Sequence, residues 1–151
     1  MADDLASANV NRSYSLAGTS IAIFTFVLIF MYPRFVSGEI GPVPFQATLL
    51  VMGVATFAFV LASFSYYCAS MGSRFDDAER TLHSRRGDRF WLLGYTLLFL
   101  TPSLILFAIR LRAVGSAWIA LWLVYLFLVI RYFPRIQTVR PGAMPDTARA
   151  S

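Results

Sequence analysis

The stretch VPFQATLLVMGVATFAFVLASFSYYCASM, residues 43–71, contains no charged side chain. Surface helices of soluble proteins carry a polar face, so a helix that is apolar on every side is typical of a membrane span. Small residues recur along it in steps of three and four, so they lie on one side and let a second helix approach closely. They are Thr48, Val51, Ala55, Ala58, Ala62, Ser65, Ala69 and Gly72. The stretch therefore predicts the central transmembrane helix of a small multi-pass protein.

The composition of the whole chain agrees with a membrane protein. Of its 151 residues, 58% are hydrophobic and 14% are charged, whereas a soluble domain carries about 25% charged residues. The net charge is +5, and the arginines that carry it flank apolar runs, as charges that orient a membrane protein do. We therefore expect membrane lipids, and no nucleic acid, as partners. The single Cys68 excludes an internal disulfide and a CxxC redox pair.

Three further apolar segments approach the length of ~20 residues that crosses a bilayer. The sequence thus predicts an all-α fold, an integral membrane bundle of four antiparallel transmembrane helices within residues 15–133. The helices are expected at about residues 15–32, 43–71, 90–109 and 116–133. Residues 1–14 are expected to form a polar cytoplasmic segment, and residues 134–151 a disordered cytoplasmic tail. The first helix should remain uncleaved, because its apolar run is too long for a signal peptide, and should end at Pro33.

The distribution of arginine predicts the orientation of the chain in the membrane. Residues 1–14, a charged loop at residues 72–89 and the C-terminal tail hold most of the arginines, whereas few lie on the other side. Cytoplasmic loops are enriched in basic residues, so both termini are predicted to be cytoplasmic, in a bacterial inner membrane. Arginines near the surface attract anionic lipid headgroups by ~1 kcal/mol each. The candidates for headgroup contact are Arg85, Arg86, Arg89, Arg131 and Arg135.

A second row of small residues predicts close packing between the first two helices. Its members, spaced three and four apart, are Ser15, Gly18, Ala22 and Thr25. In antiparallel helices this row would lie in the same leaflet as the later part of the row in residues 43–71. The expected contacts there are with Ala55, Ala58, Ala62, Ser65 and Ala69. Ala62→Leu is therefore expected to disrupt the pair.

The charged loop is expected to extend the second helix. Opposite charges four residues apart, such as Asp76 and Arg80, stabilise a helix, which would continue until Gly87 breaks it. Asp76, Glu79 and His83 would then share one face and could bind a divalent metal. Because this is the only histidine of the chain and arginines surround it, a solvated helix face is the favoured interpretation.

Two features of the last two helices are expected to shape the bundle. Gly94, Thr101 and Ala108 recur at steps of seven on the third helix, and Pro102 should kink it. An aromatic stripe on the fourth helix is expected to face lipid or another subunit. The stripe consists of Trp118, Trp122, Tyr125, Val129 and Tyr132.

The interiors of the apolar segments contain no Asp, Glu, Lys, Arg or His; Arg131 lies near the end of the last segment. Proton-coupled transporters and voltage sensors depend on such groups inside the membrane. The chain also shows no Ser–His–Asp set, no paired cysteines and no glycine-rich phosphate loop. We therefore expect a non-enzymatic structural or accessory subunit without a cofactor. It would pack with itself as a homo-oligomer or with a larger membrane-protein partner.

Two alternative functions remain open from the sequence. The first is an oligomeric pore or small-solute permeation protein lined by hydroxyl groups. Its lining would come from Thr48, Thr56, Ser63 and Ser65, or from Thr101 and Ser103. The second is a membrane enzyme that acts on lipid at the cytoplasmic face. It would use Asp76, Asp77, Glu79 and His83.

Overall fold

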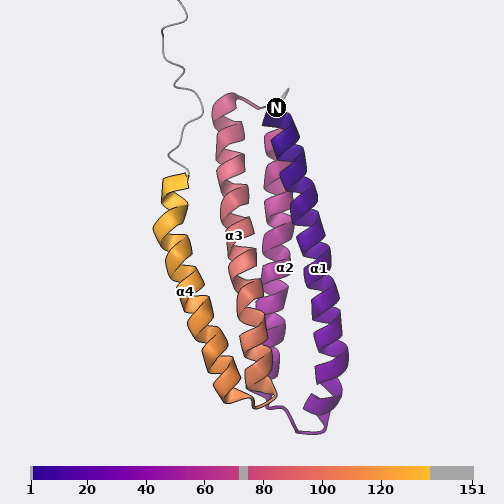
Figure 1. Ribbon diagram of the computed structural model, residues 1–151. Helices are drawn as coiled ribbons and strands as arrows, with labels where there is room; N and C mark the ends of the chain where they lie inside the picture. The colour runs from indigo at the N-terminus through magenta and orange to yellow at the C-terminus, as the bar shows by residue number, and fades with distance from the viewer. Residues whose placement is uncertain (1, 72–74, 137–151) are drawn as a thin grey trace, which may run out of the picture.

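The computed structural model describes the backbone of residues 2–71 and 75–136, and the side chains of residues 7–71 and 75–131. Within these ranges the fold is all-helical, as the sequence predicts. The helices are α1 (Ala2–Val36), α2 (Pro42–Ser70), α3 (Asp77–Ala108) and α4 (Arg112–Ile136) (Figure 1). Each of the four is long and apolar enough to cross a membrane. Residues 134–136 of the expected disordered tail are the end of α4, so the prediction is wrong there. The rest of that tail, Gly72 and the side chain of Arg135 lie outside the described residues.

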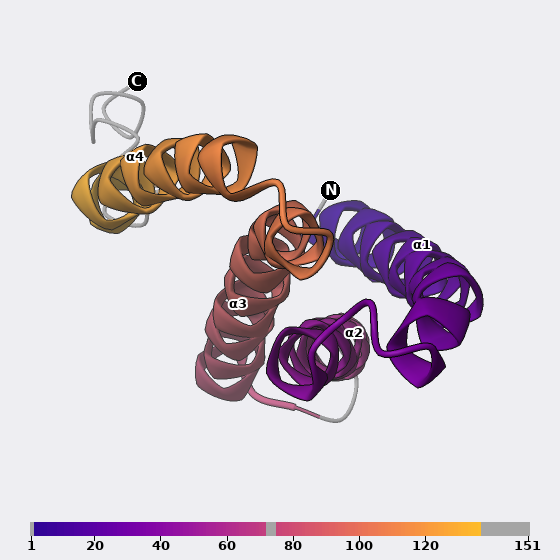
Figure 2. The ribbon, with the colours of Figure 1, turned by 90° about the horizontal axis from the view of Figure 1, so that it is seen from below.

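Successive helices run in opposite directions (Figure 1). The start of α1, the end of α2 and the start of α3 lie at one end of the fold, which we call the charged end, and α4 runs back toward it. Viewed along the axes, α2 lies between α1 and α3, and α4 lies on the far side of α3 (Figure 2). Among the described residues α4 contacts only α3. The helices therefore form an open, curved row in which α1 and α4 are the outer members.

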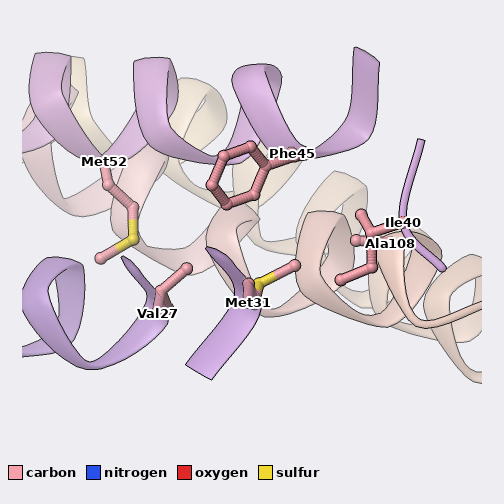
Figure 3. Packing of buried hydrophobic residues seen from close by; sticks show 6 residues of the cluster. All are labelled: Val27, Met31, Ile40, Phe45, Met52 and Ala108. Atoms are coloured by element: carbon pink, nitrogen blue, oxygen red, sulfur yellow. The ribbon is translucent and has the colours of Figure 1, made fainter. Parts of the chain in front are cut away.

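The hydrophobic core lies between α1 and α2, toward the end opposite the charged end (Figure 3). The partly buried ring of Phe35 packs against it and stacks on Phe45, with the ring centroids 4.7 Å apart. The buried members of this cluster are Val27, Met31, Ile40, Phe45, Met52 and Ala108. Many other large apolar side chains, such as Phe26, Phe57 and Phe127, are exposed instead. An apolar exterior around a small core fits a chain that is surrounded by lipid.

The bounds of α1 differ from the sequence prediction at both ends, and α4 begins at Arg112 instead of residue 116. Residues 2–14, expected as a polar segment outside the bundle, are the first turns of α1. The expected end at Pro33 is also wrong, since α1 continues to Val36. Proline lacks only its own backbone donor, and its carbonyl still accepts from Ser37 N at 3.0 Å. Gly38, with a φ of 78°, then ends the helical path.

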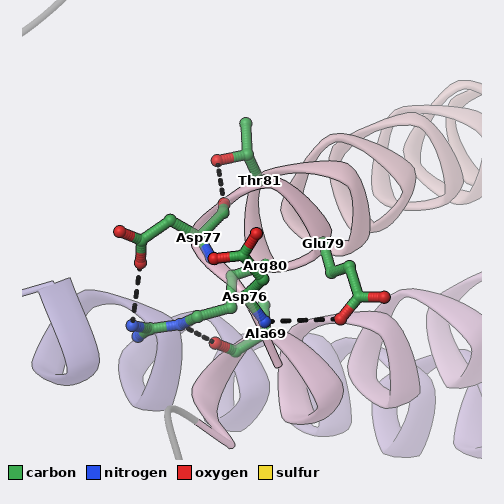
Figure 4. A network of polar contacts seen from close by, with 6 residues as sticks. All are labelled: Ala69, Asp76, Asp77, Glu79, Arg80 and Thr81. Atoms are coloured by element: carbon green, nitrogen blue, oxygen red, sulfur yellow. Dashed lines mark hydrogen bonds and ion pairs between the residues drawn. The ribbon is translucent and has the colours of Figure 1, made fainter. Parts of the chain in front are cut away.

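The charged residues after position 76 start α3 and do not extend α2, so the predicted continuation of the second helix is wrong. A capping box begins α3: the Asp76 carboxylate accepts from Asp77 N at 2.8 Å, and Glu79 Oε2 accepts from Asp76 N at 3.3 Å (Figure 4). Arg80 Nε donates to Ala69 O at 3.1 Å, which joins this first turn to the end of α2. The sequence signal was an Asp followed three residues later by Glu. Gly87 lies inside the continuous helix and does not break it.

Asp76→Ala should lower the free energy of unfolding by about 1 kcal/mol, because the first turn of α3 loses its side-chain acceptor. Thermal unfolding in a mild detergent measures the effect. Asp76→Asn keeps an acceptor oxygen at the same place and serves as the matched control, with stability close to that of the natural chain. Equal stability of the Ala and Asn variants would contradict the capping role.

The small residues of α2 pack against α3. A Cβ atom on Gly94 would lie 2.9 Å from Phe59 Cε1 and 3.1 Å from Ala55 O, and one on Gly87 would lie 2.8 Å from Tyr66 Cε1. Both glycines are buried, as are Thr101 and Ala108 further along α3. The predicted seven-residue row on the third helix therefore begins one step earlier, at Gly87. All five predicted packing residues of α2 are buried: Ala55, Ala58, Ala62, Ser65 and Ala69.

The predicted small-residue row of the first helix does not meet α2. Its four members, Ser15, Gly18, Ala22 and Thr25, are exposed, so the expected contact is wrong. The buried side of α1 is a neighbouring row: Ser13, Ala17, Ser20, Val27 and Met31. On this side Ser20 Oγ and Thr56 Oγ1 share a hydrogen bond of 2.8 Å between α1 and α2. Two rows of α1 have the same spacing, and only the fit to α2 distinguishes them.

Candidate functional site

Polar groups from three helices surround a cavity of about 190 Å³ near the charged end. From α2, Tyr66 donates a hydrogen bond to Asp88 Oδ1 of α3 at 2.7 Å. From α1, the guanidinium of Arg12 lies 5.2 Å from the centre of the Trp91 ring on α3, a cation–π distance. Asn9 completes this side of the lining. These contacts connect α1 to α3 as well as α2 to α3, and they fix the relative positions of three helices.

Ser13 is the one buried side chain without a hydrogen-bond partner among the described residues. It is fully buried and lines the same cavity. A buried polar atom normally bonds to protein or to ordered water, and a cavity of this size has room for water. Sequence patterns gave no sign of this cluster, because its members come from three separate segments and each fits an interfacial position on its own.

A second concavity, of about 410 Å³, lies between α2 and α3 close to the charged end; we call it the α2–α3 groove. Its wall on α3 carries cationic side chains, and its wall on α2 is mostly apolar. The lining consists of Leu61, Phe64, Ser65, His83, Arg86, Arg89 and Phe90. Two of the arginines expected to contact lipid, Arg86 and Arg89, are therefore brought together. The exposed Arg85 and Arg131 do not line the groove.

The metal ligands suggested by the charged loop have other contacts. Asp76 and Glu79 belong to the capping box of α3, and the His83 ring lies 5.3 Å from the ring of Phe75. Among the described residues no group of three or more His, Cys, Asp or Glu side chains could hold a metal ion. The three candidates therefore do not form a metal site, because Asp76 and Glu79 form the capping box at the start of α3.

The hydroxyl groups proposed as a pore lining all bond to backbone carbonyls. Five donate to the carbonyl four residues earlier on their own helix: Thr48, Thr56, Ser63, Ser65 and Thr101. Ser103 donates across to Gly115 O of α4 at 3.0 Å. These donors are therefore engaged inside the chain, and α3 remains helical through Pro102.

Three members of the aromatic stripe of α4 contact α3 within the same chain. The expectation that the stripe faces lipid or another subunit is wrong for Trp122 and Tyr125, whereas Trp118 contacts α3 and is still 36% exposed. Trp118 Nε1 donates to Phe99 O at 3.1 Å, and Trp122 Nε1 donates to Thr96 O at 2.9 Å. The ring of Tyr125 stacks on Phe99 with centroids 5.2 Å apart. Each of the two indole N–H groups finds its acceptor among the backbone carbonyls of α3.

A third concavity lies at the end opposite the charged end, with a volume of about 340 Å³. Its charged lining consists of Arg34 in the last turn of α1, Glu39 between α1 and α2, and Arg110 after the end of α3. The backbone of Arg110 has a φ of 66°, the left-handed conformation that usually follows a helix. Its amide donates to Phe107 O at 3.1 Å, and that of Leu111 donates to Leu106 O at 2.9 Å, which together end α3 in a Schellman motif.

Comparison of the chain with protein-family models, with curated proteins and with solved structures gives no match.

Proposed function

We propose that this chain is an integral protein of a bacterial inner membrane, with both termini in the cytoplasm, and that it acts as a non-enzymatic structural or accessory subunit. The arginine distribution supports the orientation, because Arg12 and the arginines that begin α3 all lie toward the charged end. The subunit would pack with a second copy of itself or with a larger membrane-protein partner.

The exposure of α4 is the observation that carries this proposal. Only 6% of its membrane-length apolar segment is buried, against 39% for α2. Within the part of the chain that the structure describes, the helix has one neighbouring helix, α3, and its tryptophans Trp118 and Trp122 already bond to that neighbour. The remaining sides carry large apolar side chains. The exposed ones are Val114, Leu121, Leu123, Val124, Phe127, Leu128 and Ile130.

The polar side chains of the helix interiors also favour packing over permeation. The hydroxyls of α2 and α3 are bonded to carbonyls within the chain. A pore built from them would have to break these bonds or present a lining with few free donors. An oligomeric pore therefore remains the second candidate, and no described contact favours it.

Cross-linking through α4 tests the proposal. Cys68 is the only cysteine, so Cys68→Ala gives a background in which single cysteines can be introduced. Leu121→Cys on α4 should form a dimer, or a heavier adduct with a larger partner, when native membranes are treated with a bis-maleimide. Ile29→Cys on α1 is the matched control, since it is 62% exposed against 63% for Leu121 and should cross-link far less.

Two results would overturn the proposal. One is equal cross-linking at Leu121 and Ile29, which would reflect random collision in the bilayer. The other is the absence of any adduct at Leu121 together with a monomeric mass in mild detergent. A dimer would identify a second copy as the partner, and a heavier adduct would identify a larger protein.

A further inference from the structure

We propose that the α2–α3 groove binds one anionic phospholipid. Its phosphodiester would lie against Arg86 and Arg89, and an acyl chain would run along Leu61, Phe64 and Phe90. This inference rests on the membrane location proposed above, but not on the association through α4. The sequence suggests a general attraction between several arginines and the membrane surface. The groove instead offers a defined site for a single lipid.

The charges of the groove select for an anion. Arg86 and Arg89 stand three residues apart on α3 and thus share a face. Neither forms an ion pair or a side-chain hydrogen bond with another described residue. The described residues that line the groove include no Asp or Glu. The nearest acidic residue in sequence, Asp88, accepts from Tyr66 and lines the separate cavity toward α1. Both guanidinium groups therefore have N–H donors that no described residue uses, and guanidinium groups bind phosphate well.

The apolar wall of the groove favours a lipid over a soluble anion. Phe64 is 62% exposed, and Leu61 and Phe90 are partly exposed beside it. Ser65 is small and donates its hydroxyl to Leu61 O at 2.8 Å, so it leaves space without offering a free donor. The groove volume of about 410 Å³ falls within the range of ~300–1,000 Å³ that ligand sites occupy. A free phosphate would use the arginines and leave this wall empty.

The groove lies at the depth that a lipid headgroup would occupy. Arg86 and Arg89 are the last basic residues before the apolar run of α3, which begins at Phe90. Tyr66, Tyr67 and Trp91 lie at the same level along α2 and α3, and aromatic residues of this kind collect at membrane interfaces. The cationic part of the groove thus lies at the interface, and its apolar part continues toward the hydrocarbon.

Lipid retention during native mass spectrometry tests the inference. The chain is purified in a neutral detergent, stripped of lipid and mixed with equal amounts of phosphatidylglycerol and phosphatidylcholine. One phosphatidylglycerol per chain should be retained in preference to phosphatidylcholine. Arg86→Gln combined with Arg89→Gln should weaken its binding about 30-fold, since each arginine near the surface contributes ~1 kcal/mol. Arg85→Gln is the matched control and should weaken binding about fivefold at most, because Arg85 is exposed outside the groove and offers only the general attraction of a surface arginine.

Two further measurements distinguish a lipid from other anions. Phe64→Ala leaves every charge in place and should still weaken phosphatidylglycerol binding several-fold, since an exposed apolar wall is removed. Inorganic phosphate in excess should not displace the lipid. Binding that resists Phe64→Ala, or that phosphate displaces, would overturn the inference in favour of a simple anion site. Equal loss on Arg85→Gln would overturn it in favour of unspecific attraction to any arginine.

Extraction of membranes with alkaline carbonate separates this inference from the proposal on which it rests. Retention of the chain in the membrane pellet, together with equal binding of both lipids, would overturn only the lipid site. Release of the chain into the supernatant would overturn the membrane location and the lipid site together. The cross-linking of α4 is a separate measurement on a different surface.

Discussion

Gly94→Leu should separate α2 from α3 and lower the free energy of unfolding by about 3 kcal/mol. Even the first added carbon would lie 2.9 Å from Phe59 Cε1 and 3.1 Å from Ala55 O. Phe59 is fully buried and Ala55 O belongs to the backbone, so neither neighbour can move aside without shifting a helix. Unfolding in mixed micelles of a mild and a denaturing detergent, followed by circular dichroism, measures the loss.

Gly53→Leu provides the matched control for this substitution. Gly53 also lies inside a helix, but a Cβ atom there would meet nothing within 4 Å. Leucine is a better helix former than glycine, so the control should be as stable as the natural chain or slightly more stable. If the two variants unfold at the same detergent fraction, the close contact between α2 and α3 is not formed.

Ala62→Leu should lower the free energy of unfolding by about 2 kcal/mol, because Ala62 is fully buried and a larger side chain must displace its neighbours. The small-residue rows in the sequence lead to the same expectation for Gly18→Leu on the first helix. The structure predicts different outcomes for the two substitutions, since Gly18 is exposed and a Cβ atom added there would meet nothing within 4 Å. Gly18→Leu should therefore retain full stability.

Thermal unfolding of Ala62→Leu and Gly18→Leu in the same detergent distinguishes the packing seen in the structure from the packing expected from the sequence. A large loss at Ala62 with none at Gly18 supports the packing described here. Equal losses would restore the row of Ser15, Gly18, Ala22 and Thr25 as a contact surface, either within the chain or between copies. A stable Ala62→Leu variant would contradict the burial of α2 itself.

Part of the fold follows from the sequence alone. The helix content and the number of helices follow from apolar segments of membrane length. The packing side of α3 follows from Gly94, Thr101 and Ala108, since a strict seven-residue repeat keeps one face toward a neighbouring helix. The packing side of α2 follows similarly, because small residues such as Ala55 and Ala62 recur on one side of a long apolar run.

Other parts could not be predicted, for identifiable reasons. The apolar part of α1 has no polar face that would mark its packing side, so the burial of Ser20 depends on where Thr56 lies on the neighbouring helix. The start of α3 was recognisable from Asp76 and Glu79, but charge pairs at the same positions fit an extension of α2 equally well. Both sites near the charged end combine side chains from different helices. The contacts of Asp88 and of Arg86 therefore appear only when α2 and α3 are placed together.

The open row of helices has a consequence for how the chain is made. Nearly all of the contacts that each helix forms are with the helix before it or after it in sequence. A chain with contacts of short sequence separation has little loop-closure entropy to overcome. In the membrane location proposed above, each helix after the first thus meets a packing partner that is already inserted, and assembly can proceed one helix at a time. Helix α4 is the last to be synthesised, and its two indole N–H groups can then bond to carbonyls of α3, which has already formed.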